Sequence, residues 1–493
     1  MENKVMQEPD IEIRLTSPEH IPFKFSIGIR EASDSENFGH TLEVTGTNPE
    51  TGTEKTIHYQ LADKAHNAYL DFYEKMAREF NLRMPLNRQP RKAKPATKIP
   101  YRQLLTQNFN KDIQYGYGDP AVLRVEDDSG EAPWYYLVST TNDSPEAFPI
   151  LRSQNLVDWE FVRFVFPLGQ KPLWAAEGEL ISDYWAPEMH QVGNEFWLYF
   201  VARDKHSREL CIGMAKASKP EGPFTSEDEP ILTGNIIDPH VFVQENGTAY
   251  LYWKEDNNDV WPGKLIDLLL SQPELLPVLF PNQQDQVTAS FILTVWPWAR
   301  MLEPMERFLV IQVLIEAITS RYLECYHLLS HLLENHPTEV QEQIREVQAF
   351  MKTPMFAQQL SPDGRTLIGT RTKILENDLE WEAHLVEGMW ISQQGDKYYL
   401  FYAGNDFSTD QYGIGVAIGD SPLGPFQKMQ QPFLQTTAEW WAPGHPSVAT
   451  GPDGKPMLFL HAYFPGQAGY KQFRALLAVT LRFERDKVLI EEG

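Results

Sequence analysis

Cysteine is scarce in this sequence, because its 493 residues include only Cys211 and Cys325. Two cysteines cannot build a disulfide framework of the kind that holds small secreted domains together. Positive charge is also scarce, with 43 Lys and Arg against 68 Asp and Glu and a net charge of −25. This balance disfavours nucleic acid and anionic membranes as partners and suits a neutral substrate.

Long apolar runs are missing as well. The most apolar stretch, residues 308–333, is interrupted by Gln312, Glu316, Arg321 and Glu324. A membrane span needs about 20 mostly apolar residues, so this stretch predicts an amphipathic helix and no membrane partner. The first residues, MENKVMQEPDIEIRL, show no basic segment followed by an apolar one, which is the pattern of a secretory signal. We therefore expect a cytoplasmic protein.

A unit of strand, turn and aromatic-rich strand recurs five times. An acidic residue or a histidine heads each first strand, in GDPAVLRV (Asp119), APEMHQV (Glu188), IDPHVFVQ (Asp238), VEGMWISQ (Glu387) and GHPSVATG (His445). The second strands are WYYLVS, FWLYFV, AYLYW, YYLFY and MLFLHAY. Such repetition is typical of a β-propeller, whose innermost strands surround one axis. We therefore predict a mainly β fold, a five-bladed β-propeller in which the five heads meet at one mouth of the channel.

Composition divides the rest of the chain. Residues 1–82 carry strand-like segments and then a helical pattern, which predicts a small α+β module. Residues 83–100 contain regularly spaced prolines and basic residues without acids, which predicts an extended linker. The propeller is expected in 101–263 and 354–493. Leucine-rich helical periodicity in 264–353 predicts an α-helical insertion that interrupts it.

Three acids at one mouth carry an electrostatic cost, because like charges raise one another's pKa values. Glycoside hydrolysis uses such an arrangement: one protonated carboxylic acid donates to the leaving oxygen while an ionised carboxylate activates water. An Asp-Pro pair is also a common turn starter. Five heads in the same place of five units favour the functional interpretation over that structural one.

These motifs resemble glycoside hydrolase family 43, the five-bladed β-propeller hydrolases. The resemblance is carried in order by GDPAV, WAPEMH, IDPHVF, VEGMW and GHPSV. The segment LRSQNLVDWEFV and two segments that end in GPF resemble further motifs of the family. The resemblance covers neither the N-terminal module nor the helical insertion.

The resemblance implies a role for each head. Asp119 matches the general base, Glu387 the general acid, and Asp238 the acid that tunes and orients the donor. The family inverts configuration, which implies a base and acid roughly 6.5–9.5 Å apart. His445 matches a histidine that orders a metal ion or its waters, so a structural calcium ion in the channel is expected, although the chemistry requires no cofactor. Glu188 matches an acid with a structural or substrate-positioning role.

Sugar recognition needs flat apolar faces edged by hydrogen-bonding groups. Trp185, which precedes the APE motif, is the first candidate for such a platform. Further candidates are Phe148, Trp390, Trp440, Trp441 and, as an arginine near the sugar in similar sequences, Arg474. Packing between blades is the competing role for the aromatic residues.

The expected function is an inverting hydrolase that removes terminal α-L-arabinofuranosyl or β-D-xylosyl groups from oligosaccharides. Two alternatives stay open: a non-catalytic carbohydrate-binding propeller and an endo-acting arabinanase. A fructan-cleaving enzyme is disfavoured, because it would carry an NDPN-type strand with RDP and EC motifs where this chain has GDPA, IDPH and VEGM. The insertion could restrict access of polymers to the pocket or mediate homo-oligomer formation through its leucines.

Overall fold

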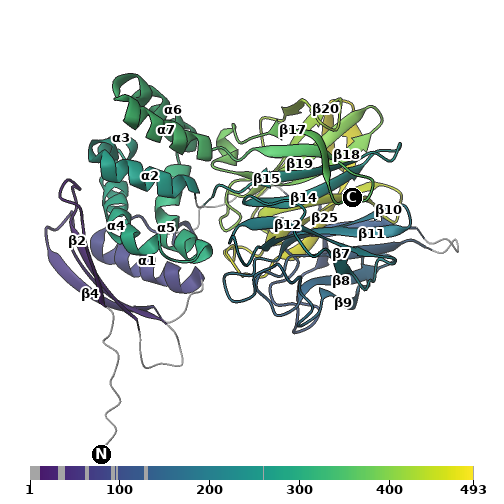
Figure 1. The fold of residues 1–493 in the computed structure, drawn as a ribbon, viewed down its shortest axis with the longest axis horizontal. Coiled ribbons are helices and arrows are strands. Elements are labelled where there is room, and N and C mark those ends of the chain that lie inside the picture. The colour runs from purple at the N-terminus through teal and green to yellow at the C-terminus, as the bar shows by residue number, and fades with distance from the viewer. Residues whose placement is uncertain are drawn as a thin grey trace, which may run out of the picture. The chain divides into compact units, whose positions relative to one another are not determined.

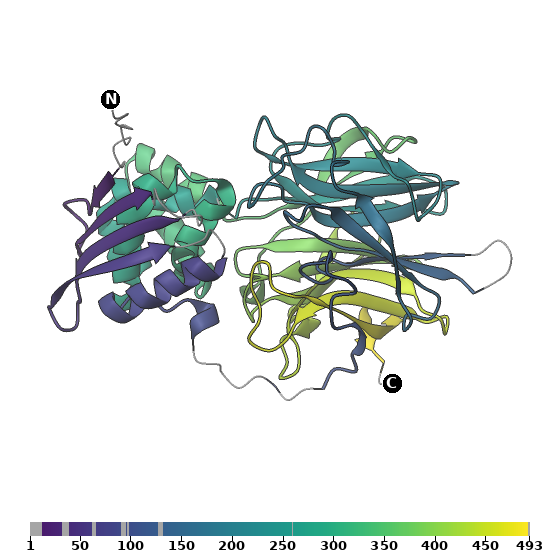
Figure 2. The same ribbon diagram turned by 90° about the horizontal axis from the view of Figure 1, so that it is seen from below.

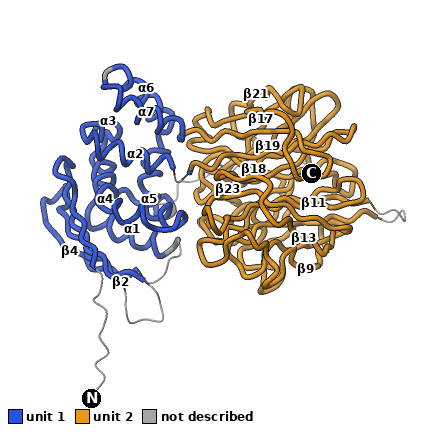
Figure 3. Tube along the Cα trace, in the orientation of Figure 1, with its two compact units in different colours: residues 1–90, 258–350 blue, residues 91–257, 351–493 orange. Residues whose placement is uncertain are grey.

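The computed structural model describes residues 12–31, 39–61, 66–89, 95, 98–126, 132–258 and 260–491. The chain folds into two compact units, each made of two separate stretches of sequence (Figure 3). Unit 1 consists of residues 1–90 and 258–350, and unit 2 of residues 91–257 and 351–493. Part of the predicted linker, residues 90–94, 96 and 97, lies outside the described residues, while Leu86–Arg88 form a short 3-10 helix.

Unit 1 joins the N-terminal module to the helical insertion. Its antiparallel sheet has the order β1 (Glu12–Thr16), β2 (Phe25–Glu31), β3 (His40–Thr47) and β4 (Glu54–Leu61). Helix α1 (His66–Phe80) packs against β4, and α4 (Gln283–Ala299) packs against β1 and β2, so that helices cover one face of the sheet (Figure 2). The remaining helices are α2 (Val260–Ser271), α3 (Leu276–Leu279), α5 (Pro304–Thr319), α6 (Tyr322–Leu332) and α7 (Thr338–Phe350).

Aromatic packing and polar contacts hold the two stretches of unit 1 together. The Phe25 ring lies 5.3 Å from Phe291 of α4, and Arg83 pairs with the buried Asp285 at 2.9 Å. The sequence predicted the N-terminal module and the insertion as separate segments; the structure places them in one unit. It also starts the helices at Val260, within the stretch that was predicted to close the propeller.

Unit 2 is built from five antiparallel sheets (Figure 1). The first is β6 (Ala121–Val125), β7 (Trp134–Val138), β8 (Ala147–Ser153) and β9 (Glu160–Phe166). The second is β10 (Trp185–Val192), β11 (Glu195–Arg203), β12 (Leu210–Ala217) and β13 (Thr225–Ser226). The third is β14 (Ile236–Val243), β15 (Ala249–Glu255), β16 (Met355–Leu360) and β17 (Leu367–Leu375), so the chain visits unit 1 between its second and third strands.

The fourth and fifth sheets complete unit 2. The fourth is β18 (Val386–Gln394), β19 (Lys397–Gly404), β20 (Gly413–Gly419) and β21 (Phe426–Lys428), and β22 (Leu434–Gln435) also pairs with β20. The fifth is β23 (Trp441–Thr450), β24 (Pro456–Tyr463), β25 (Ala475–Glu484) and β26 (Lys487–Ile490), and β5 (Arg102–Leu105) also pairs with β25.

The first strands of the five sheets lie next to one another. Strand β6 contacts β10, β10 contacts β14, β14 contacts β18, β18 contacts β23, and β23 contacts β6. The predicted mainly β character is therefore confirmed, and the five predicted heads all lie on these first strands or directly before them. Within the described residues, no helix combines the length and apolar character needed to cross a membrane.

Candidate active site

All five first strands begin with the same irregularity. One residue of each has a positive φ between 43° and 58°: Asp119, Ala186, Asp238, Gly388 and Ala442. The pairing register of β10, β14, β18 and β23 shifts at this residue, as in a β-bulge. A left-handed backbone conformation is strained for a residue with a Cβ atom. Residues strained in this way are found most often at functional sites, where the unusual backbone orients a side chain.

Relative to the bulged residue, the five heads lie at four different positions, and His445, which has a positive φ of 48° itself, lies three residues past Ala442. Asp119 and Asp238 are the bulged residues themselves, whereas Glu387 directly precedes the bulged Gly388. Glu188 follows the bulged Ala186 by two residues, in the same position as His240 and Trp390 on the next two strands. The sequence treated the five heads as equivalent; the structure separates Glu188 from the three acids.

Asp119 is surrounded by an arginine, two imidazoles and a hydroxyl group. Its Oδ1 accepts a hydrogen bond from Arg474 Nη1 at 2.8 Å and lies 3.5 Å from Nδ1 of His445, while Oδ2 accepts one from the Thr140 hydroxyl. Its backbone N–H donates to Nδ1 of the buried His461 at 3.1 Å. Burial by itself would raise the pKa of Asp119, but Arg474, the two imidazoles and the Thr140 hydroxyl together hold that pKa well below its ordinary value. This carboxylate is ionised at neutral pH.

A motif glycine makes the Arg474 contact possible. The guanidinium of Arg474 lies directly against the backbone of Gly118, where a Cβ atom would come within 1.7 Å of the guanidinium carbon. Arg474 was predicted to lie near the sugar. Because Arg474 is buried and hydrogen-bonded to Asp119, we assign it the role of binding that carboxylate instead of the sugar.

Glu387 and Asp238 are buried next to each other. Glu387 is 9% exposed and Asp238 7%, and Asp238 Oδ2 accepts a hydrogen bond from the N–H of Gly388 at 2.7 Å. The pKa of Glu387 is raised to about 7, because burial and the charge of Asp238 raise it more than Lys254 lowers it. Burial also raises the pKa of Asp238 to about 7, again against the charge of Lys254. These two acids therefore hold protons near neutral pH, in contrast to Asp119.

Glu387 is oriented by two residues that the sequence analysis missed. Its Oε1 accepts a hydrogen bond from the Tyr412 hydroxyl at 2.7 Å, and its Oε2 lies 3.5 Å from Nζ of Lys254. Tyr412 reaches this position because it lies against Gly444 of the GHPS motif, where a Cβ atom would come within 1.8 Å of the tyrosine ring. Neither residue belongs to a strand head, and Lys254 directly follows the aromatic segment AYLYW, so the repeat pattern gave no signal for them.

The predicted metal site requires side chains whose donor atoms lie close together and are free to bind an ion. One group of three acidic or imidazole side chains in the described part of the chain has the spacing of a metal site: Glu188, His190 and His240. Glu188 Oε2 lies 2.9 Å from His190 Nε2 and 2.8 Å from His240 Nδ1. Since Nε2 of His240 accepts the N–H of Ile391 at 3.0 Å, the ring proton is on Nδ1, which donates to Glu188.

A protonated Nδ1 has no lone pair for a metal, and calcium prefers six to eight oxygen ligands. The cluster of Glu188, His190 and His240 is therefore a hydrogen-bonded group that does not fit calcium. His445 lies beside Asp119 and belongs to the surroundings of that carboxylate. A calcium ion in the channel stays a prediction, and no residue is assigned to it.

The predicted sugar-binding aromatics fall into two groups. Trp185 and Trp441 are half-buried and precede the bulge, in the same position of their strands as Glu387. Phe148 is completely buried among Phe166, Tyr184 and Phe200, so no face of its ring is open to a sugar. The Trp390 ring packs 4.6 Å from His240, two residues past the bulge, and Trp440 is buried against Phe464.

Phe148 and Trp440 are therefore not expected to contact the sugar, whereas Trp390 is half-buried and stays a candidate. Glu188 is not expected to contact the sugar either, because it is 3% exposed and its Oε2 is engaged by two imidazoles. The structural half of its predicted role agrees with these contacts. Trp185 and Trp441 also stay as candidates.

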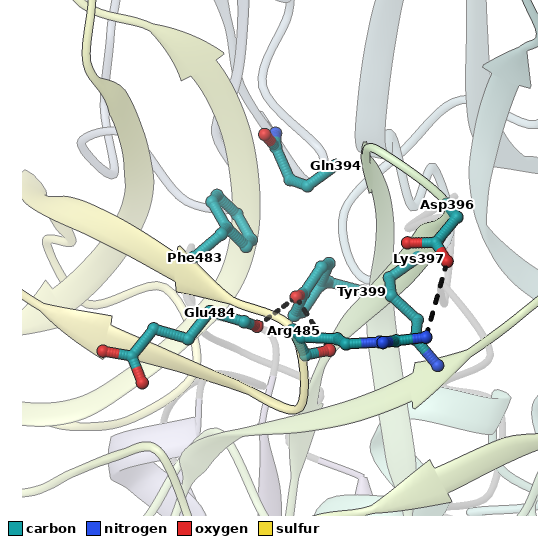
Figure 4. Close-up of a pocket in the computed structure, with 7 residues that line it drawn as sticks. All are labelled: Gln394, Asp396, Lys397, Tyr399, Phe483, Glu484 and Arg485. Carbon is teal, nitrogen blue, oxygen red and sulfur yellow. Dashed lines mark hydrogen bonds and ion pairs between the residues drawn. The ribbon is translucent and has the colours of Figure 1, made fainter.

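A different pocket of unit 2 lacks these features (Figure 4). Its Tyr399 hydroxyl donates to the backbone carbonyls of Glu484 and Arg485. The side chains of Arg485 and Asp396 lie 3.9 Å apart and are 74% and 77% exposed, so water screens their charges. The mouth with Asp119, Asp238 and Glu387, where the carboxyl groups are largely buried, is the better candidate active site.

Comparisons with known proteins identify the family of the chain. The profile of Glycosyl hydrolases family 43 matches residues 112–275 and 342–489, which is more than half of the chain. A xylosidase/arabinosidase from Bacteroides ovatus is 24% identical over 300 residues, covering 61% of this chain and 70% of that protein. Xylosidase/arabinosidase 43A from Humicola insolens is 43% identical over 84 residues, covering 17% of this chain and only 24% of that protein.

A solved structure of a thermostable family-43 glycoside hydrolase has a similar fold. Its TM-score is 0.52 at 23% identity, and the match covers 77% of this chain and 93% of that one. The profile match includes all five strand heads and stops within the helical insertion on both sides, at residues 275 and 342. The chain belongs to the glycosyl hydrolases of family 43.

Proposed function

We propose that this protein is an inverting glycoside hydrolase that removes terminal α-L-arabinofuranosyl or β-D-xylosyl groups from oligosaccharides. Membership of family 43 supports the reaction class. The printed names of the Bacteroides ovatus and Humicola insolens relatives support the two sugars. The five sheets joined through their first strands support a five-bladed β-propeller as the architecture.

The contrast between Asp119 and Glu387 carries the proposal. Asp119 is kept ionised by Arg474, so it acts as the general base that takes a proton from water. Glu387 is kept protonated near neutral pH, so it acts as the general acid that donates to the leaving oxygen. Asp238 and Glu387 repel each other when both are ionised, so Asp238 raises the pKa of Glu387. Asp238 also accepts a hydrogen bond from the N–H of Gly388 next to the acid. A pair of carboxyl groups with opposite protonation is what a single displacement by water requires.

Trp185 and Trp441 are proposed to hold the sugar. Both tryptophans are half-buried and occupy the position that Glu387 has on its own strand. A partly exposed aromatic ring can pack on the C–H surface of a pentose, and the polar groups around Asp119 can bind its hydroxyls.

Hydrolysis of aryl pentosides tests the proposal. The protein is incubated with aryl α-L-arabinofuranoside and β-D-xyloside, and ¹H NMR follows the anomer that is released first. We expect release of the inverted sugar by the wild-type protein. Binding without hydrolysis would indicate a carbohydrate-binding propeller, and fast loss of viscosity in arabinan without release of monosaccharide would indicate an endo-acting arabinanase. Either result would overturn the proposal.

A further inference from the structure

Lys254 is a buried cation next to the proposed acid. It lies near the end of β15, paired in register with Ile237, the residue before Asp238. Its side chain is 0% exposed, and its Nζ lies 3.5 Å from Glu387 Oε2 and 3.4 Å from Asp256 Oδ1. A lysine without contact to water must be compensated by negative charge. Asp256 supplies that charge while Glu387 is protonated, and the two carboxylates share the lysine once Glu387 ionises.

This arrangement is unexpected for a general acid. A cation within about 4–6 Å favours the ionised form of a carboxyl group and lowers its pKa by about 1–3 units. Lys254 therefore works against the proton that Glu387 must hold. Asp256 offsets this effect, because it competes for the same ammonium group.

Other charged and titratable groups also face this cluster. Asp238 of β14 and His445 of β23 act on Glu387, and Tyr412, which precedes β20, donates to it. His384, which precedes β18, is buried, and its pKa is lowered by burial and by the charge of Lys254. Lys254 and Asp256 differ from Asp238 in carrying no proposed direct role in the reaction. Because Lys254 is fully buried, its removal deletes no contact with a substrate.

We propose that Lys254 and Asp256 are a pair of positioning residues that sets the upper pH limit of hydrolysis, by fixing how readily the carboxyl group of Glu387 gives up its proton. The inference rests on the proposed role of Glu387 as the general acid. Lys254 makes the acid strong enough to donate, and Asp256 keeps it from ionising too early. The two residues act in opposite directions on the same proton.

The test compares pH profiles of kcat/KM for Lys254→Met and Asp256→Asn. The alkaline limb of that profile reports the ionisation of the essential acid in the free enzyme. Without the cation, Glu387 ionises at higher pH, so Lys254→Met should move the alkaline limb upward by about 1–3 pH units. Without the competing carboxylate, Lys254 acts more strongly on Glu387, so Asp256→Asn should move the limb downward by a smaller amount.

A matched control uses a distant pair. Lys397 and Asp420 form a 2.6 Å ion pair on the fourth sheet, and Asp420 is 81% exposed. Lys397→Met and Asp420→Asn should leave the profile unchanged. Alkaline limbs that do not move in the Lys254 and Asp256 variants, or that move in the same direction, would overturn the inference.

A second measurement separates this inference from the proposed function. Infrared spectroscopy follows the protonated carboxyl band during a pH titration, and the band that is missing in Glu387→Gln identifies the acid without any turnover. Opposite shifts of this band in Lys254→Met and Asp256→Asn would support the pair even if no pentoside is hydrolysed. Hydrolysis that depends on Glu387, together with an unshifted band, would leave the function standing and remove the pair. If Lys254→Met does not fold, Asp256→Asn alone still decides the direction.

Discussion

Asp119 and Glu387 lie in the same candidate site, and both are largely buried, yet their surroundings act on them in opposite directions. Asp119 has a direct 2.8 Å hydrogen bond from an arginine and a second from a hydroxyl group. Glu387 has a lysine at 3.5 Å that it shares with Asp256, and it lies beside Asp238. Burial alone would raise both pKa values. The comparison shows that the number and closeness of cations per carboxylate decides which acid keeps its proton.

The largest expected effects come from removing the two carboxyl groups. Asp119→Asn cannot accept a proton from water and Glu387→Gln cannot donate one, so each should lower kcat by about 10²–10⁴-fold. Steady-state kinetics on an oligosaccharide measures the loss. Asp420→Asn, which changes an exposed aspartate of the same unit, serves as the control. Turnover near that of the wild type in either variant would contradict the assigned roles.

A methyl group at Gly118 should disturb the surroundings of Asp119 and leave those of Glu387 unchanged. In Gly118→Ala, the new Cβ atom would overlap the Arg474 guanidinium and push it away from Asp119. A displacement of about 1 Å at such a group can cost about 10²-fold in rate. The pKa of Asp119 should also rise, so the acid limb of the kcat/KM profile should move to higher pH.

Gly28→Ala in unit 1 is the matched control, because its added Cβ atom would meet nothing closer than 3.5 Å. Both variants are checked for folding by circular dichroism. A Gly118→Ala protein with the kinetics and acid limb of the wild type would show that Arg474 is not what keeps Asp119 ionised.

The pH dependence of kcat/KM for the wild-type protein tests the role of Glu387 as the proton donor. The pKa of Glu387 is raised to about 7, so the acid is protonated below this pH and ionised above it. We therefore expect kcat/KM to fall as the pH rises above about 7. Asp238, whose pKa is also raised to about 7, titrates together with Glu387, so the limb reports the pair of acids. A profile that stays flat up to pH 9 would mean that Glu387 is not the proton donor.

The smallest effect on activity is expected from a change at Glu188, which lies two residues past the bulge. Glu188→Ala removes the shared acceptor of His190 and His240 and leaves these buried rings without their partner. The free energy of unfolding should fall by about 1–3 kcal/mol, measured by urea denaturation, while kcat per folded molecule stays close to that of the wild type. A large loss of kcat with unchanged stability would show that Glu188 takes part in the reaction, and would contradict the separation of Glu188 from the three acids.

The repeat predicted the first two strands of every sheet in unit 2, because each pair is encoded by one local stretch of alternating and aromatic residues. The same heads led to the three acids. What local sequence could not predict was contact across sheets: Arg474 and His461 on Asp119, and Tyr412 and Lys254 on Glu387. Nor could it locate the bulge, which moves Glu188 two residues past the equivalent position of Asp238.

The organisation of unit 1 was also out of reach of local patterns. The helical periodicity of the insertion and the strands of the N-terminal module were predicted as separate segments. Their packing depends on contacts between residues about 200 positions apart, such as the pair of Arg83 and Asp285. Alternation and periodicity describe only neighbours in the chain.

The most direct test of the account varies the leaving group. A departing group of low pKa needs no proton, so Glu387→Gln should still hydrolyse a dinitrophenyl pentoside at a rate close to that of the wild type, but should lose activity on an alkyl or sugar leaving group. Asp119→Asn should lose activity on both, because water must be activated in either case. Two results would contradict the assignment of acid and base. One is an equal loss of activity on both leaving groups in Glu387→Gln, and the other is hydrolysis of the dinitrophenyl pentoside by Asp119→Asn at a rate close to that of the wild type.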